Sequence, residues 1–488
     1  MLVFTRATAA PKIEFTSTCL QAQACLYTLK LNQAEKLIAK ELRINPNNRA
    51  ADYLNTLRSM LLYITQEDDA SHSVFDSIKD DCLTRLSECD PIAGYRDFLK
   101  EEVYFYSSVV NGKRGNALSA ANDVRHAYNL GQDVIKDFPS FTMAKKTLGL
   151  LQSGFGSLPN TYRKLVSFMG YPSDMDAGIS YLNACINVKS TNSEFILMRK
   201  EAQFYLASVY LYLKNDKTTA WKVIDDITQD YPTNPLSAFA RVNIADKCKF
   251  NEEVIRVVEQ TPRESPYGSI PFLDFALGKA KLQRLDSDAD IPLLRFVETT
   301  KGSSYIKSSY QKLSWHALFF NDESTYYHYI AMTATKGSDQ LEEDEQALKY
   351  AKSGITPDSI LLKSRLLYDG GYYQRALEVI RPFKKVNFET SRERTEYFYR
   401  KARIYDALPD EKLAEAFYKA TIAEGSELPQ YYASFAALYL GELYEHQNNV
   451  ELAREFFKKS MQFDANKEYK KSVEYKAKAG IDRLENKS

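Results

Sequence analysis

The chain has 488 residues, of which 64 are Lys or Arg and 64 are Asp or Glu, so it carries no net formal charge at pH 7. A balanced total provides no global field to attract nucleic acid or an acidic membrane surface, which disfavours a nucleic-acid-binding role. No apolar run approaches the roughly 18 residues that a membrane-spanning helix needs, so no transmembrane segment is predicted.

The first 16 residues do not match a helical repeat. Ala7-Thr8-Ala9 has the small-x-small pattern of a signal-peptidase site, but Leu2-Val3-Phe4 is too short for the apolar core of a complete signal peptide. Two interpretations stay open. Segment 1–16 is either the remnant of a truncated signal peptide, which would export the protein to a bacterial cell envelope, or the disordered end of a cytoplasmic protein.

We interpret residues 17–300 as an irregular array of helical repeats. The first clear unit spans Thr18 to Pro46. In it, small and bulky residues alternate at helix-packing positions and a proline closes the second helix: Ala22, Cys25, Ala34, Ile38 and Pro46. Apolar residues at three-to-four spacing then predict helices near residues 49–65, 73–88, 92–111 and 115–137.

Residues 149–172 interrupt the helical pattern with glycines and prolines. Gly154-Phe155-Gly156 lacks the preceding strand and the further glycines of a phosphate-binding loop. We expect a helix that ends at these glycines, and a new helix through Arg163 and Phe168. The alternative is that the helices part here around an apolar pocket for a lipid or other small ligand, lined by aromatic and Met side chains: Phe155, Tyr162, Phe168, Met169 and Tyr171.

Residues 301–488 show the most regular repeats. In 360–383, two short helices meet at Asp369-Gly370-Gly371, with small or bulky residues where a tetratricopeptide repeat places its packing side chains. Two further copies follow at 398–421 and 437–465, and an amphipathic helix near 467–485 closes the array. The predicted fold class is all-α, a right-handed superhelix of antiparallel helix pairs of the tetratricopeptide-repeat type.

In such a superhelix the first helix of each pair lines the concave surface. Projecting the C-terminal repeats onto that geometry places six residues inward as candidates for partner binding: Arg365, Tyr368, Tyr399, Arg403, Asp406 and Phe435. Arg and Tyr anchor interfaces through bidentate ion pairs and amphipathic rings, so Arg365 and Arg403 are candidates to hold a partner's carboxylate. The competing interpretation is that they form local salt bridges such as Arg403–Asp406.

Catalytic, metal and cofactor patterns are missing from the sequence. The five histidines are scattered and none lies in an HExxH arrangement, although His316 and His328 flank one hairpin. No GxSxG motif, no Cys/His nucleophile pair and no zinc-ligand spacing occurs. We expect the six cysteines to be buried apolar thiols, with a disulfide between helices or a reactive thiol as alternatives. The sequence therefore predicts a non-enzymatic protein without cofactor or metal.

Two segments resemble one family of repeat proteins. GLLQSGFGSLPNTYRKLVSFMGYPSDMDAGISYL (149–182) and AWKVIDDITQDYPTNPLSAFARVNIADKCKFNEEVI (220–255) are similar to consecutive segments of the tetratricopeptide-repeat-39 and inclusion-body-clearance family. The order and spacing of the segments extend the resemblance over 17–460, and the overall pattern looks closest to uncharacterised bacterial envelope-associated members. The resemblance implies a helical scaffold that binds a protein or peptide partner and has no known enzymatic activity.

Overall fold

The protein is α-helical throughout the part of the chain that the structure describes. This computed structural model describes residues 10–91, 94–158, 170–171, 174–190, 192–262, 270–320, 322–463 and 468–486. Within them the one β-type pairing is an isolated bridge between Lys12 and Asn48. The predicted all-α fold class is therefore confirmed. The helix expected through Arg163 and Phe168 lies outside the described residues.

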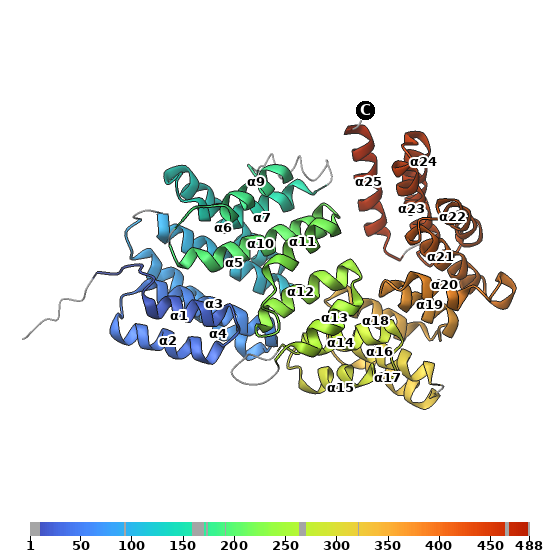
Figure 1. Cartoon of the computed structure of the whole chain (residues 1–488), viewed down its shortest axis with the longest axis horizontal. Helices are drawn as coiled ribbons and strands as arrows, with labels where there is room; N and C mark the ends of the chain where they lie inside the picture. The colour runs from blue at the N-terminus through green and yellow to red at the C-terminus, as the bar shows by residue number, and fades with distance from the viewer. Residues whose placement is uncertain are drawn as a thin grey trace, which may run out of the picture.

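The helices follow one another as antiparallel pairs (Figure 1). The first part of the array consists of α1 (Ser17–Leu26), α2 (Leu31–Ile44), α3 (Arg49–Gln66), α4 (Asp69–Ser87), α5 (Tyr95–Lys113), α6 (Ala117–Asp137), α7 (Lys145–Gly156), α9 (Met175–Ile186), α10 (Glu194–Ser208) and α11 (Lys217–Ile227). A 3-10 turn, Thr142–Ala144, precedes α7, and a π-helical turn, Val209–Leu213, follows α10. The four helices predicted between residues 49 and 137 are confirmed.

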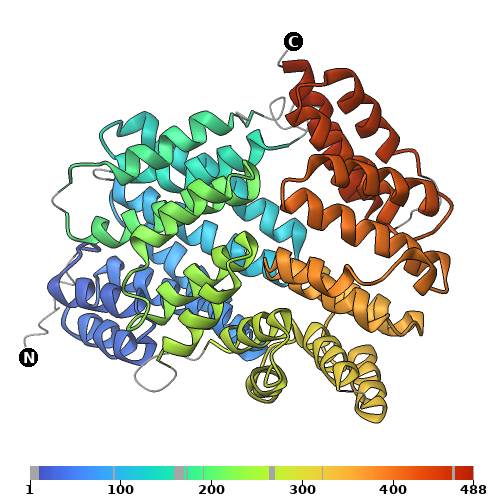
Figure 2. The same ribbon diagram turned by 45° about the vertical axis from the view of Figure 1, so that its right-hand side comes forward.

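The array continues without a break in its contacts to the C-terminal helices (Figure 2). These are α12 (Pro235–Cys248), α13 (Asn251–Gln260), α14 (Phe272–Arg284), α15 (Asp290–Thr299), α16 (Ile306–Phe319), α17 (Glu323–Thr335), α18 (Glu342–Ser353), α19 (Ser359–Asp369), α20 (Tyr373–Ile380), α21 (Ser391–Ala407), α22 (Glu411–Gly425), α23 (Tyr432–His446), α24 (Val450–Ser460) and α25 (Lys470–Asn486).

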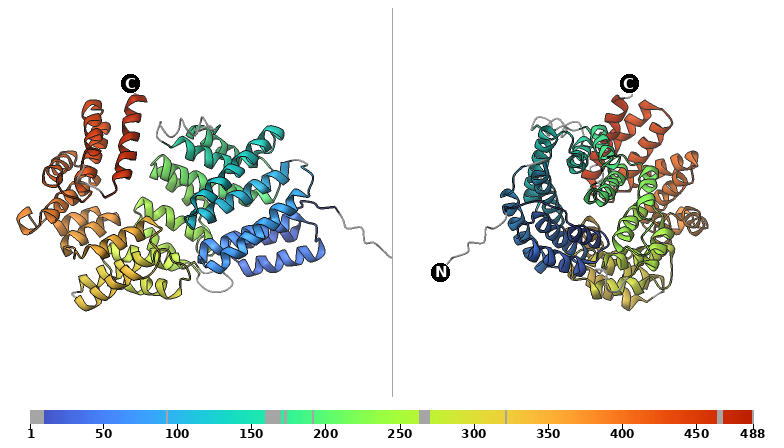
Figure 3. Two further views of the ribbon diagram at one scale, coloured as in Figure 1. Left: turned by 180° about the vertical axis from the view of Figure 1, so that it is seen from behind. Right: turned by 60° about the vertical axis from the view of Figure 1, so that its left-hand side comes forward.

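The contacts between helices define the superhelix. Most second helices contact the first helix of the next pair, as α2 contacts α3 and α22 contacts α23, whereas α18 packs on α16 and α17, and α19 packs on α14. The first helices α19, α21, α23 and α25 also contact one another in succession. The same holds for α1, α3, α5 and α7, and for α12, α14 and α16. First helices therefore form a continuous inner layer around which the second helices are arranged, and the chain curves into the ring-like outline of Figure 3.

Small residues set how closely the two helices of a pair approach. A Cβ on Gly441 of α23 would lie 2.8 Å from the ring of Phe457 on α24, and one on Gly278 of α14 would lie 2.5 Å from Leu293 on α15. Real Cβ atoms do not approach other heavy atoms this closely, so a larger residue would force the helices apart. Both glycines therefore stand where two paired helices cross most closely.

The turn between α19 and α20 requires glycine for two reasons. Gly371 has φ +87°, in the left-handed region that L side chains rarely adopt, and a Cβ there would lie 2.4 Å from the carbonyl oxygen of Lys249. At the other end of α19, the side chain of Asp358 accepts a hydrogen bond from the backbone N–H of Leu361 and caps the helix. The predicted hairpin across Asp369-Gly370-Gly371 is confirmed.

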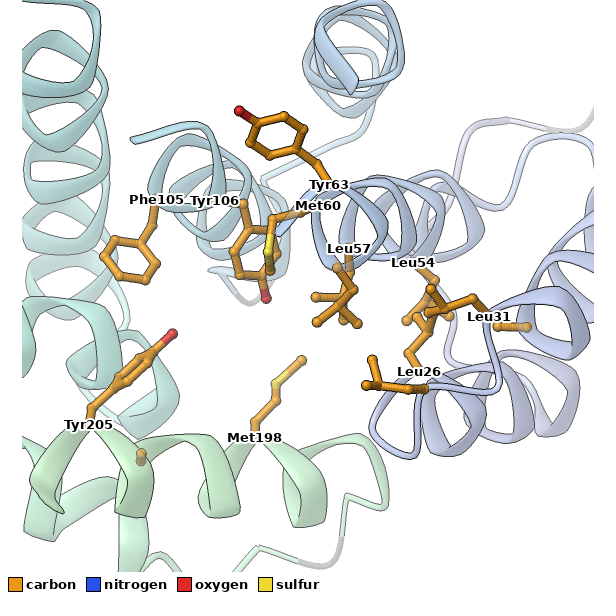
Figure 4. Packing of buried hydrophobic residues seen from close by; sticks show 14 of the residues in the cluster. Leu26, Leu31, Leu54, Leu57, Met60, Tyr63, Phe105, Tyr106, Met198 and Tyr205 are labelled. Atoms are coloured by element: carbon orange, nitrogen blue, oxygen red, sulfur yellow. The ribbon is translucent and has the colours of Figure 1, made fainter. Parts of the chain in front are cut away.

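Helix α10 lies against the inner layer formed by α1, α3, α5 and α7 (Figure 4). Figure 4 shows Met198 and Tyr205 of α10 facing buried residues of that layer, among them Leu57 and Tyr106. The concave surface of the N-terminal part is thus filled by the chain itself. One large hydrophobic cluster extends from Cys19 to Ala280.

Two acidic residues in the first turn of α18 contact α16. Asp344 is fully buried, and its carboxylate accepts hydrogen bonds from the backbone N–H groups of Tyr305 (2.6 Å) and Ser308 (2.9 Å) at the start of α16. Glu343 pairs with the buried ammonium group of Lys312 at 2.7 Å. Asp344 satisfies N–H groups that have no partner within α16 itself, so a residue of α18 caps the start of α16.

The last helix, α25, corresponds to the predicted capping helix and packs on α23 and α24. Its other side approaches the N-terminal part, where the hydroxyl of Tyr475 donates to the carbonyl oxygen of Ser157 at 2.9 Å. This contact joins residues that are 318 positions apart in the sequence, so the C-terminal helix lies beside the end of α7.

Candidate functional site

The six candidate residues come from three consecutive first helices. Arg365 and Tyr368 lie on α19, Tyr399, Arg403 and Asp406 on α21, and Phe435 on α23. The three rings are buried, whereas the side chains of Arg365, Arg403 and Asp406 are 39%, 19% and 34% exposed. The aromatic residues therefore form a floor, and the charged groups above it are the atoms that a partner can reach. Whether a partner binds them stays a prediction.

Alternating cations and rings cross this floor from one helix pair to the next. The ammonium nitrogen of Lys249 lies 3.5 Å from the ring centroid of Tyr368. The guanidinium carbon of Arg403 lies 5.4 Å from the same centroid and 3.6 Å from the ring centroid of Tyr439. Each cation–ring contact contributes about 0.5–2 kcal/mol, depending on desolvation. The Arg403 guanidinium thus lies between the rings of Tyr368 and Tyr439.

A cluster of rings borders this series on α21, α23 and the start of α25. Tyr399, Tyr431, Tyr432, Phe435 and Tyr469 contact one another with ring centroids 4.6–6.0 Å apart. Arg400 stacks over Tyr399 and Tyr432 while it donates to Glu396 at 2.7 and 3.1 Å. Because the guanidinium group of the buried Arg400 is already paired with the Glu396 carboxylate, Arg400 stabilises the ring cluster and is not a candidate to bind a partner.

Arg365 and Arg403 differ from Arg400 in how fully they are paired. Arg365 lies 5.4 Å from the ring of Trp315, and its nearest carboxylate oxygen is that of Asp369, 3.6 Å from Nε. Arg403 contacts Asp406 at 3.5 Å and the hydroxyl of Tyr418 at 3.3 Å, both through Nη1. These distances are long for charge-assisted hydrogen bonds, which favour 2.7–2.9 Å. The local salt bridges of the competing interpretation therefore exist, but they leave most of the guanidinium donors unused by the described residues.

Burial and neighbouring charges shift the pKa values of Lys249 and Glu442, which lie beside these rings. Burial lowers the pKa of Lys249 to about 7, with Asp369 acting in the opposite direction and the cations Arg403, Lys217 and Arg400 adding to the decrease. Burial raises the pKa of the Glu442 carboxyl on α23, although Arg403 partly offsets it. Near neutral pH the inner face therefore keeps the positive charges of its arginines while part of its lysine charge is lost.

Sequence reasoning missed several residues of this face. Tyr431 and Tyr432 stand out as a pair in the sequence, and their position at the start of a first helix was a usable signal. Lys249 had no such signal, because it lies 119 residues from Tyr368, whose carbonyl oxygen accepts a hydrogen bond from its ammonium group at 3.0 Å. Only the curvature of the array brings the end of α12 to α19.

The alternative ligand pocket near residues 149–172 is described only in part. Phe155 and Tyr171 pack on the ring of Tyr128 and on each other, with centroids 5.1–6.0 Å apart, so they contact protein instead of lining a space. Tyr162, Phe168 and Met169 lie outside the described residues. A hollow of about 260 Å³ does occur elsewhere, between α5 and α10, where Tyr95, Phe141 and Phe195 line it.

The two histidines of the α16–α17 hairpin contact different partners. His316 contacts the carbonyl oxygen of Ser287 and the carboxylate of Asp290, whereas His328 packs on Tyr329. Among the residues described, no three His, Cys, Asp or Glu side chains gather as metal ligands. All six cysteines are free thiols, five of them buried, and no described helix is long and apolar enough to cross a membrane.

Comparisons with known proteins leave the family open. No protein family matches the chain, and no curated protein is similar to it at a significant level. The resemblance to the tetratricopeptide-repeat-39 family therefore stays a prediction.

Solved structures of helical proteins match over most of the chain. The yeast Tom70 structure has a TM-score of 0.25 and 12% identity, and covers 96% of this chain and 89% of its own. The human IFIT1 dimer with PPP-AAAA has a TM-score of 0.33 and 10% identity, with coverages of 92% and 91%. Cut9 in the APC/C Cut9–Hcn1 hetero-tetramer has a TM-score of 0.24 and 11% identity, with coverages of 96% and 89%. With values this low, the fold is established by the helix contacts above.

Proposed function

We propose that the protein is a non-catalytic scaffold that binds a peptide or a helix of a partner protein on the concave face of α19, α21 and α23. The observation that carries the proposal is the pair of incompletely satisfied guanidinium groups of Arg365 and Arg403, each in contact with aromatic rings. Planar guanidinium edges fit carboxylates bidentately, and Arg and Tyr dominate the energetics of protein interfaces.

The position of the floor supports a macromolecular partner over a small ligand. The cation–ring series runs from the end of α12 across α19, α21 and α23, so a ligand that used all of it would have to extend across these helices. Pockets for small molecules are enclosed and bury most of the ligand's surface, which a shallow floor of this kind does not do. The lipid-carrier alternative draws no support from the described part of residues 149–172.

Capture of partners from the native source tests this proposal. We expect Arg365→Glu/Arg403→Glu to reduce recovery of a partner that the wild-type protein captures by about 30-fold or more, because each reversal removes a charge-assisted contact and adds repulsion. The matched control is Arg381→Glu/Lys412→Glu, which reverses two exposed cations on or beside the second helices α20 and α22 of the same pairs. Circular dichroism establishes that both variants remain folded. Equal capture by the two double variants would contradict the proposal.

A further inference from the structure

Helix α10 shows how a helix packs on the inner layer of the N-terminal part: it is the first helix of the α10/α11 pair, and it also reaches helices earlier in the array. Helix α10 is fixed there by contacts to α1, α5 and α7, three different first helices of the inner layer. Gln23 donates to the carbonyl oxygen of Glu194 at 3.1 Å, and the hydroxyl of Tyr95 donates to its carboxylate at 2.6 Å. The ammonium group of Lys146 lies 2.5 Å from the carboxylate of Glu201.

The residues of α10 that face this layer follow helical spacing. Phe195, Met198, Ala202 and Tyr205 are buried and lie three or four positions apart, while Ile196 and Lys200 are exposed. Side chains at i, i+3, i+7 and i+10 share one face of a helix, which is how an amphipathic helix occupies a groove. The acidic residue Glu201 lies between Met198 and Tyr205 of this apolar series, and its carboxylate contacts Lys146 of α7.

Glu201 is recognised by one ammonium group and two tyrosine hydroxyls. Besides Lys146, Tyr27 donates to Glu201 Oε2 at 3.0 Å and Tyr205 donates to Oε1 at 2.6 Å. Lys146 in turn lies 5.5 Å from the ring of Tyr205. A first-helix cation, held among tyrosine rings, therefore binds a carboxylate presented by a helix inside the groove.

The face formed by α19, α21 and α23 has similar chemistry, but the carboxylates nearest to Arg365 and Arg403 lie 3.6 and 3.5 Å away, at distances longer than a strong ion pair. Arg403 lies among the rings of Tyr368, Tyr439 and Tyr418, as Lys146 lies among tyrosines, and Arg365 lies one helix pair away. Among the described residues no acceptor within hydrogen-bond distance engages the guanidinium of Arg365. The guanidinium donors of Arg365 that face no acceptor are therefore open to a carboxylate from a partner.

We propose that the partner presents an amphipathic α-helix to this face, with an Asp or Glu on the buried side between apolar residues three positions before and four positions after it. This inference rests on the proposed function and narrows it from any peptide to a helix. It places the partner's carboxylate on the N–H edges of Arg403 and Arg365, as Glu201 lies on Lys146.

The backbone of the partner gives an independent reason to prefer a helix over an extended strand. The walls of the groove are α-helices, whose N–H and C=O groups are paired within each helix, and the floor is made of rings. An extended peptide would therefore bury backbone groups that find few partners on this floor, whereas a helix satisfies its own. Strand addition needs a free sheet edge, which this face does not provide.

The chain's own α10 sequence supplies the probe for a test. The probe is a synthetic peptide EFILMRKEAQFYLAS (residues 194–208), blocked at both ends and cross-linked between positions 196 and 200, whose side chains are exposed in α10. The cross-link is needed because an isolated helix of this length is only marginally stable in water. Binding to the full-length protein is followed by fluorescence anisotropy with a labelled peptide.

We expect the peptide to bind the wild-type protein, and Glu201→Gln in the peptide to weaken binding roughly 10- to 100-fold through the loss of charge-assisted hydrogen bonds. Arg365→Gln/Arg403→Gln in the protein should weaken binding to a similar extent, while Arg381→Gln/Lys412→Gln should leave it unchanged. Once the arginines are replaced, Glu201→Gln in the peptide should have little further effect, because both changes remove the same interaction.

Two outcomes would overturn the inference in different ways. If a peptide without the cross-link and with Ala202→Pro, which breaks the helix, binds as tightly, the groove takes an extended chain; the proposed scaffold function then survives and the helix inference fails. If the cross-linked peptide does not bind, or binds equally to both arginine states, the groove does not recognise an acidic helix. Capture of a native partner that depends on Arg365 and Arg403 would still support the broader function.

Discussion

Replacing Lys146 with methionine is expected to lower the free energy of unfolding of the N-terminal part by about 3–5 kcal/mol, measured by urea denaturation. Lys146 is fully buried, and its ammonium group pairs with the carboxylates of Glu102 and Glu201. Burial alone would lower the pKa of Lys146, but these two carboxylates outweigh it and hold the pKa above its usual value, so the amine stays charged. Its removal leaves two carboxylates buried without a counter-charge.

Two comparisons separate the loss of the ion pair from a change in packing. The triple variant Lys146→Met/Glu102→Gln/Glu201→Gln should regain most of the stability, because it removes both carboxylate charges together with the ammonium group. Lys349→Met, which breaks the exposed pair of Lys349 and Glu345, should cost at most about 0.5 kcal/mol. If Lys146→Met costs no more than Lys349→Met, the buried cluster does not fix α10 in its groove.

The glycines at the crossing of α7 and α9 give the second large expected effect. A Cβ on Gly178 would lie 2.6 Å from the carbonyl oxygen of Gly149 and 2.6 Å from the backbone nitrogen of Ser153. Both are backbone atoms, so the helices must separate to admit even one methyl group. Gly178→Ala is therefore expected to destabilise the protein by about 3 kcal/mol, at the upper end of ordinary overpacking, in thermal or urea unfolding.

Gly154 in α7 is the matched control for this substitution. It lies on the same pair of helices, but a Cβ there would meet no atom within 4 Å. Gly154→Ala should therefore be neutral or stabilise the protein by up to about 1 kcal/mol, because alanine loses less backbone entropy in a helix. Effects of the same sign and size for the two substitutions would show that helix propensity, and not the close approach of α7 to α9, decides stability here.

The helix pairs could be predicted because the residues that pack together within one repeat lie within about 34 positions of each other in the sequence. Gly441 and Phe457 stand 16 residues apart, and their contact follows from the pattern alone. The hairpin at Gly371 and the capping helix α25 were predictable for the same reason. The division of the array at residue 300 stays a prediction, because helix contacts continue from α14 through α16.

The sequence predicted which residues of α19, α21 and α23 face inward, but not which residues from distant parts of the chain contact them. Placing Arg365 and Arg403 on first helices needed only the repeat register, whereas the contact between Lys249 and Tyr368 depends on how strongly the array curves. The filling of the N-terminal groove by α10 was beyond prediction for the same reason, since Tyr27 and Glu201 are 174 residues apart. Periodicity specifies each pair of helices, and curvature arises from small rotations summed over many pairs.

Site-specific photocrosslinking tests most directly whether the concave face of α19, α21 and α23 is the binding surface. A benzophenone amino acid is placed at Asp369, which is 40% exposed beside Arg365, or at Lys412, which is exposed on the second helix α22. Both proteins are irradiated in extract from the native source. We expect a defined adduct with a partner protein from position 369 and none from position 412. The same adduct from both positions, or an adduct from position 412 alone, would contradict a concave-face scaffold.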